Sequence, residues 1–125
     1  MPRYAVAARL LLGLIFLVAG AAKFVFLVHP PPLPPGLAGE FISVLLRSHW
    51  VAAVGLVEFV AGALLLVNRY VILAMTVLAA VIVNILIFHA TMMPIGIFPG
   101  ILAAVLWIVA ALPLRNRFAP LLREK

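Results

Sequence analysis

The sequence contains no cysteine and no aspartate, and only three of its 125 residues are acidic. Without cysteine the chain has no disulfide, no thiolate nucleophile and no cysteine ligand for an iron–sulfur cluster. It also lacks a glycine-rich phosphate loop and a metalloprotease signature. Glu40 and Glu58 lie on different segments, and we expect Glu58 within the membrane and Glu40 outside it. A catalytic pair of carboxylates is therefore not indicated.

Charge of either sign is scarce as well. Charged residues make up 10% of the chain and hydrophobic residues 68%, whereas about 25% of the residues in soluble domains are charged. A membrane-spanning helix needs about 20 apolar residues, and the chain holds four such runs. The sequence lacks the strict alternation of apolar and polar residues that is expected of strands. We therefore predict one all-α domain over residues 1–125, an integral membrane four-helix bundle.

The four spans are expected at about residues 10–28, 50–67, 71–88 and 94–112. The fourth should stop at Pro113, because proline cannot continue the helical hydrogen bonds, and Pro99 should kink it. The first run can also be interpreted as a signal peptide, since arginines precede it and small residues occupy positions 19–22. Because the apolar run continues to Val28, we favour a first span that is retained.

Basic residues predict the orientation. If the four helices alternate, one side receives Arg3, Arg9, Arg69, Arg115, Arg117, Arg123 and Lys125. The other side receives only Arg47 outside the apolar runs. The positive-inside rule then places both termini in the cytoplasm. We expect the protein in the inner membrane of the cell. The net charge of +6 is thus a topological signal, and no nucleic-acid partner is predicted, because little aqueous surface remains.

The predicted outer loop covers residues 29–49. Its run Pro30–Pro35 favours a stiff polyproline II spacer. The following residues have helical periodicity, with apolar side chains at Leu37, Phe41, Val44 and Leu45. This pattern predicts a short amphipathic helix at the outer surface, between the first two spans. It is either a lid packed on the bundle or a gate over a site between the helices, and we favour the lid.

Two spans each carry one full charge, Lys23 in the first and Glu58 in the second. A charge at mid-membrane costs about 2.5–3.5 kcal/mol on insertion scales, so it persists only with a partner or a purpose. At about 1.5 Å per residue, these two residues and Asn84 of the third span reach one level in the outer half. The glycines that share the faces of the two charges are Gly13, Gly20, Gly55 and Gly62. The three polar residues form either a structural ion-pair network or a ligand-binding or proton-handling site.

The three histidines are all expected at the outer rim. His29 ends the first span, His49 opens the second, and His89 ends the third. Met92 and Met93 follow His89 closely, and a histidine with thioethers can bind copper(I) or a haem iron. The spacing matches no defined motif, so copper and haem are disfavoured and no metal site is predicted.

Several segments resemble the DoxX family of small membrane proteins. Arg9, Gly13 and the run Gly20–Phe24 resemble the opening of its first helix, and Gly55–Glu58 with Gly62 resembles its second. Val83–His89 resembles the third helix of the DoxX-like branch. Within these segments Lys23, Glu58, Asn84 and His89 match the polar positions of the family. The similarity extends over nearly the whole chain, although the proline run departs from the family pattern.

The resemblance implies a function near quinone or sulfur redox chemistry. The family is named for a subunit of a terminal quinol oxidase assembly, and related members act in thiosulfate:quinone oxidoreduction or associate with oxidative-stress proteins. The leading hypothesis is a membrane subunit that binds a quinone-like ligand at Lys23, Glu58 and Asn84, or docks a soluble or membrane redox partner. The alternatives are a small-solute or proton-coupled carrier, which would be a homo-oligomer because four helices barely enclose a pore, and a scaffold without catalysis.

Overall fold

The computed structural model describes residues 1–124, and all regular elements within them are helical. The longer helices are α1 (Arg3–Val28), α2 (Gly36–Arg47), α3 (Trp50–Leu66), α4 (Val71–Met92) and α5 (Phe98–Ala111). The short helix α6 (Arg115–Phe118) and 3₁₀ turns at Pro94–Gly96, Leu112–Leu114 and Ala119–Leu122 complete the described chain. The prediction of an all-α fold is confirmed.

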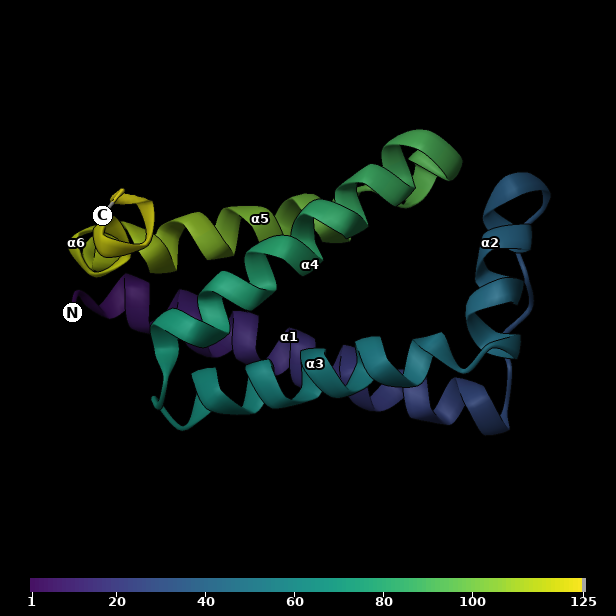
Figure 1. The fold of residues 1–125 in the computed structure, drawn as a ribbon, viewed down its shortest axis with the longest axis horizontal. Coiled ribbons are helices and arrows are strands. Elements are labelled where there is room, and N and C mark those ends of the chain that lie inside the picture. The colour runs from purple at the N-terminus through teal and green to yellow at the C-terminus, as the bar shows by residue number, and fades with distance from the viewer. Residues whose placement is uncertain (125) are drawn as a thin grey trace.

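Four of these helices run along the bundle, and α2 lies across one end of it (Figure 1). Both termini lie at the opposite end; we call these the α2 end and the terminal end. By length and composition, α1, α4 and the helical segment Phe98–Leu122 can each cross a membrane. The bent pair α2–α3 provides a fourth apolar unit. The fold is therefore that of a helical membrane bundle.

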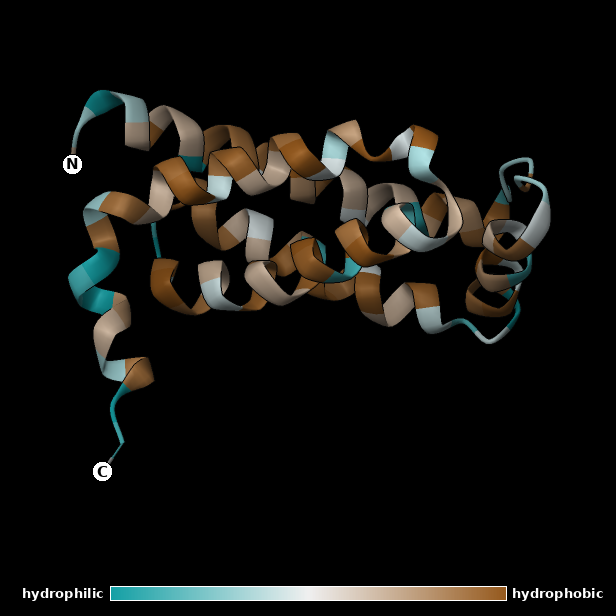
Figure 2. Ribbon diagram, turned by 90° about the horizontal axis from the view of Figure 1, so that it is seen from above, coloured by the Kyte–Doolittle hydropathy of each residue, from teal (hydrophilic) through white to brown (hydrophobic). Residues whose placement is uncertain are grey.

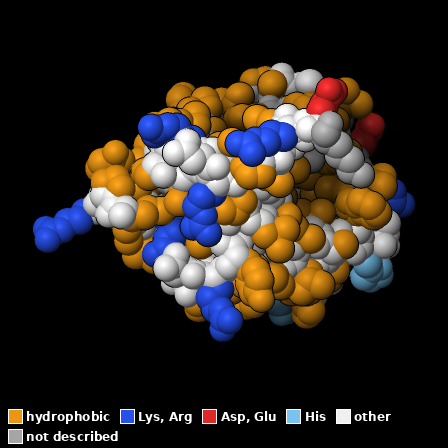
Figure 3. Space-filling view, turned by 60° about the vertical axis from the view of Figure 1, so that its left-hand side comes forward, with side chains coloured by type: hydrophobic (Ala, Val, Ile, Leu, Met, Phe, Trp, Pro, Cys, Tyr) orange, Lys and Arg blue, Asp and Glu red, His pale blue; other side chains and the backbone are white. Residues whose placement is uncertain are grey.

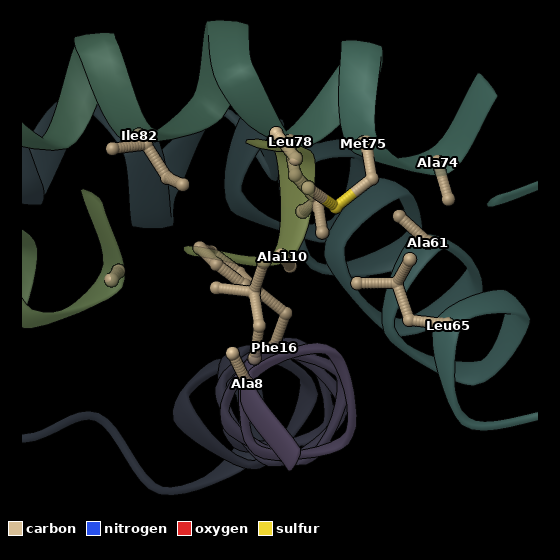
Figure 4. Packing of buried hydrophobic residues seen from close by; sticks show 12 residues of the cluster. Ala8, Phe16, Ala61, Leu65, Ala74, Met75, Leu78, Ile82 and Ala110 are labelled. Atoms are coloured by element: carbon tan, nitrogen blue, oxygen red, sulfur yellow. The ribbon is translucent and has the colours of Figure 1, made fainter. Parts of the chain in front are cut away.

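The closest helix packing is between α1 and α3, and glycines make it possible. A Cβ atom on Gly20 would lie 2.5 Å from the carbonyl oxygen of Gly55, and one on Gly13 would lie 2.9 Å from that of Gly62. Small residues of this kind allow helix backbones to approach in a membrane. Helices α4 and α5 close the bundle around a core formed by Ala8, Leu12, Phe16, Ala61, Leu65, Ala74, Met75, Leu78, Ile82, Ala103, Ala110 and Ala111 (Figure 4).

Several helix boundaries differ from the sequence prediction. Helix α1 begins at Arg3 rather than near residue 10, and α4 continues past His89 to Met92. The expectation that Pro99 kinks the fourth span is wrong. Pro99 lies in the first turn of α5, where its missing N–H has no intrahelical partner to lose.

The fourth span ends as predicted near Pro113, but the residues that follow form further short helical elements. Helix α5 ends at Ala111, and Pro113 lies in the 3₁₀ turn that follows. The chain then turns away from the bundle axis through α6, as Figure 2 shows. Phe118 of α6 packs against Trp107 of α5, with ring centroids 5.8 Å apart, and so fastens this segment to the bundle.

Arg9 has a role that was not predicted from the sequence, where it was counted only among the basic residues on one side of the membrane. It lies at the terminal end but is only 8% exposed. Its guanidinium donates a hydrogen bond to the amide oxygen of Asn68 in the turn between α3 and α4. Asn68 has a φ of 57°, in the left-handed region that asparagine tolerates better than most residues. Arg9 therefore ties α1 to this turn.

The predicted amphipathic helix is confirmed as α2, which meets α3 at an angle of 85°. The bend lies at Ser48 and His49, where His49 adopts a φ of 62°. The Ser48 hydroxyl oxygen accepts a hydrogen bond of 3.2 Å from the backbone N–H of Trp50, at the start of α3. The apolar face of α2 is divided, because Phe41, Ile42 and Leu45 line a cavity below the helix whereas Leu37 and Val44 lie outside that cavity.

Candidate functional site

The two charges in the apolar runs form an ion pair between α1 and α3. Lys23 Nζ lies 2.7 Å from Glu58 Oε2, and the side chains of Lys23 and Glu58 are 25% and 2% exposed. The glycine crossing positions them, because a Cβ on Gly55 would lie 2.9 Å from the Cβ of Lys23. An ammonium group has three N–H donors, and Glu58 is the only hydrogen-bond partner of Nζ among residues 1–124. Lys23 therefore keeps donors for another acceptor.

A cavity of about 640 Å³ adjoins this ion pair. It lies between α3 and α4, which diverge toward the α2 end, and α2 covers it (Figure 1). Its lining is mostly apolar and aromatic: Lys23, Phe41, Ile42, Leu45, Trp50, Ala53, Val54, Val57, Glu58, Val81, Asn84, Ile85, Phe88 and His89. Apolar walls with a few polar groups are typical of small-molecule sites. Phe41 of α2 packs on Phe88 of α4, with ring centroids 5.6 Å apart, and helps to close the cavity at this end.

Asn84 lines the same cavity but does not join the ion pair. Its amide Nδ2 donates to the carbonyl oxygen of Ala80 at 3.1 Å, one turn earlier in α4. In residues 1–124, no hydrogen bond links Asn84 to Lys23 or Glu58. The predicted convergence of these three residues is thus a shared cavity and not one hydrogen-bonded network.

Among the predicted rim residues, only His89 lines the cavity. Its Nδ1 lies 2.8 Å from the carbonyl oxygen of Ile85 and must donate to it, so in the neutral ring Nε2 is an acceptor. His29 and His49 are exposed, and neither Met92 nor Met93 belongs to the lining. Within the described chain, no three His, Cys, Asp or Glu side chains gather to hold a metal ion.

The aromatic lining of this cavity was not predicted from the sequence. Trp50 and Phe88 entered the sequence prediction only as the first residue of the span 50–67 and the last residue of the span 71–88. The one available signal was Phe41, which stood on the apolar face of the predicted amphipathic helix. Its contact with Phe88 depends on the bend between α2 and α3, and no local pattern specifies that bend.

Comparison with known proteins identifies the family. A family model described as DoxX matches residues 4–91, which include α1 to α3 almost completely and most of α4. The ion pair, Asn84 and His89 all lie in this range. No curated protein and no solved structure matches the chain. The sequence resemblance is confirmed, and the chain belongs to the DoxX family.

Proposed function

We propose that this protein is a multi-pass subunit of the cell inner membrane that binds a quinone-like ligand beside Lys23 and Glu58 and works with a redox partner. The observation that carries the proposal is the 640 Å³ cavity, whose apolar and aromatic walls surround one ion pair with spare donors. Membership of the DoxX family, for which the sequence resemblance implied quinone-linked chemistry, supports this ligand class. No catalytic step is assigned to the chain itself.

The chemistry of a quinone suits the groups in the cavity. Its ring is flat and apolar, and its carbonyl oxygens accept hydrogen bonds, which Lys23 Nζ and the second N–H of the Asn84 amide can donate. Hydrogen bonds that involve a charged group contribute about 1.5–3 kcal/mol. Glu58 holds the Lys23 ammonium group in position. Phe41, Phe88 and Trp50 offer faces against which the ring can pack.

The proposed orientation rests on the charges of the terminal end. Arginine side chains gather there (Figure 3), and the exposed ones include Arg3, Arg69, Arg115, Arg117 and Arg123. By the positive-inside rule this end faces the cytoplasm. Basic residues near the membrane surface also attract anionic lipids, at about 1 kcal/mol each. In this orientation α2 and the proline run lie outside the cytoplasm.

Tryptophan fluorescence can test the ligand directly. The chain has two tryptophans; Trp50 lines the cavity, whereas Trp107 donates to the carbonyl oxygen of Met75 at 2.8 Å and lies outside the lining. In a Trp107→Phe variant, para-benzoquinone should quench Trp50 in a saturable way. The further change Lys23→Met should weaken binding by about 10- to 150-fold, which corresponds to one charged hydrogen bond. Quenching that is linear, or that is equal with and without Lys23, would reject the proposal.

A further inference from the structure

A second cavity, of about 320 Å³, follows the first along the seam between α3 and α4. Val57 lines both cavities. Beyond Val57 the second cavity follows Val60 and Leu64 of α3, opposite Leu73 and Val77 of α4. We call this second cavity the seam groove. The stretch from Val57 to Leu64 is roughly 10 Å long at about 1.5 Å per residue.

Small side chains create the seam groove. Its floor contains Ala61 and Ala74, which are 4% and 1% exposed and belong to the core of the bundle. A larger side chain at either position would fill the space. Because these alanines are fixed in the core, the seam groove is a built feature of the α3–α4 interface and not a gap between loosely packed side chains.

Polar groups line only the first of these two cavities. Lys23, Glu58, Asn84 and His89 all line the first cavity. The described lining of the seam groove, by contrast, is wholly apolar. A molecule that fits both cavities therefore has a polar head and a hydrocarbon chain attached to it.

The seam groove opens at the side of the bundle. Val57, Val60 and Leu73 in its lining are 41%, 47% and 59% exposed, on a surface that faces the surrounding lipid. At the α2 end, the contact of Phe41 with Phe88 covers the first cavity. A route sideways from the bilayer, between α3 and α4, would reach Lys23 without crossing this contact.

We infer that the seam groove binds the hydrocarbon tail of the ligand whose head lies at Lys23, and that this ligand is a single-tailed amphiphile that enters laterally from the bilayer. The inference rests on the proposed function. Val57 lines both cavities, so a tail attached to a head at Lys23 need pass only this residue to reach the seam groove, which favours the ligand's own tail over an unrelated lipid chain. Lipid is as apolar as the groove, so the tail gains packing contacts rather than hydrophobic transfer energy.

A photolabelling experiment in lipid nanodiscs tests this inference. The probe is a para-benzoquinone with a decyl chain that ends in a diazirine, and the protein is the full chain. We expect the label on peptides that contain Leu64 or Leu73, and we expect excess chain-less para-benzoquinone to remove it. The variant Val60→Trp should abolish this labelling by filling the groove, and Leu73→Trp should act in the same way from α4. The matched control is Val105→Trp on α5, because Val105 is 50% exposed and outside the groove; it should change nothing.

The alternative outcomes separate the two proposals. Label spread evenly over the lipid-facing helices, and insensitive to the chain-less quinone, would overturn the tail site and indicate bulk lipid in the groove. If chain-less quinone still quenched Trp50 in that case, the proposed function would stand. If neither quinone quenched Trp50, both the proposed function and the tail site would be wrong.

Discussion

The two members of the ion pair should not be equally important for stability. Glu58 is almost completely buried, whereas the Lys23 side chain is 25% exposed toward the cavity. Lys23→Met leaves a buried carboxylate, and residues 1–124 contain no second ion pair that could replace the partner. Glu58→Gln leaves the Lys23 ammonium group without its partner. Lys23 is close to the end of α1 at Val28, so its long side chain can extend toward the α2 end and reach water.

The expected magnitudes follow from this asymmetry. Breaking a buried pair by removing one partner typically costs about 3–5 kcal/mol, chiefly because the survivor stays buried without compensation. We expect Lys23→Met to fall in that range and Glu58→Gln to fall clearly below it. The double variant should recover much of the loss, since residues in contact are not additive and two neutral side chains need no partner.

Chemical unfolding in a mild detergent, followed by tryptophan fluorescence, measures these differences. Glu40→Gln on α2 is the matched control for Glu58→Gln, because Glu40 is exposed and has no ion-pair partner in the described chain; its effect should stay within about 0.5 kcal/mol. Equal losses for the two single variants would refute the argument from burial. A double variant less stable than either single one would show that the residues do not interact.

Three further results are expected. Gly20→Ala should lower the unfolding free energy by about 1–3 kcal/mol, because the new Cβ would lie 2.5 Å from backbone atoms of α3; unchanged stability in the same denaturation assay would contradict the close helix crossing. Asn68→Gly tolerates the positive φ but removes the acceptor of Arg9, so it should cost about 1–3 kcal/mol, whereas Asn68→Asp should not. With the proposed orientation, a cysteine at Pro35 should react with an impermeant thiol reagent added outside cells and one at Asn116 should not; the reverse pattern would invert the topology.

The sequence was sufficient for the ion pair, because two charges in apolar runs need each other and glycines on the same faces indicate close packing. The sequence was not sufficient for the partner of Asn84, because a side-chain amide can also donate to a carbonyl of its own helix. The residue type alone does not show which of these hydrogen bonds forms. The burial of Arg9 was missed for a similar reason: counting charges gives the side of the membrane but not the partner across the turn. The cavity depends on the divergence of α3 and α4 and on the 85° bend, which arise from tertiary packing.

The glycine contacts between α1 and α3 also determine which parts of the cavity can vary. A side chain at Gly20 or Gly55 would collide with the backbone or the Lys23 stem, so these two helices form a single unit with a fixed charged wall. On the opposite wall, Phe41 of α2 and Phe88 of α4 meet through their side chains and not through close backbone contact. If the cavity binds the proposed ligand, relatives that prefer another ligand should differ on that wall, and a redesign of selectivity should begin there and leave the charged wall intact.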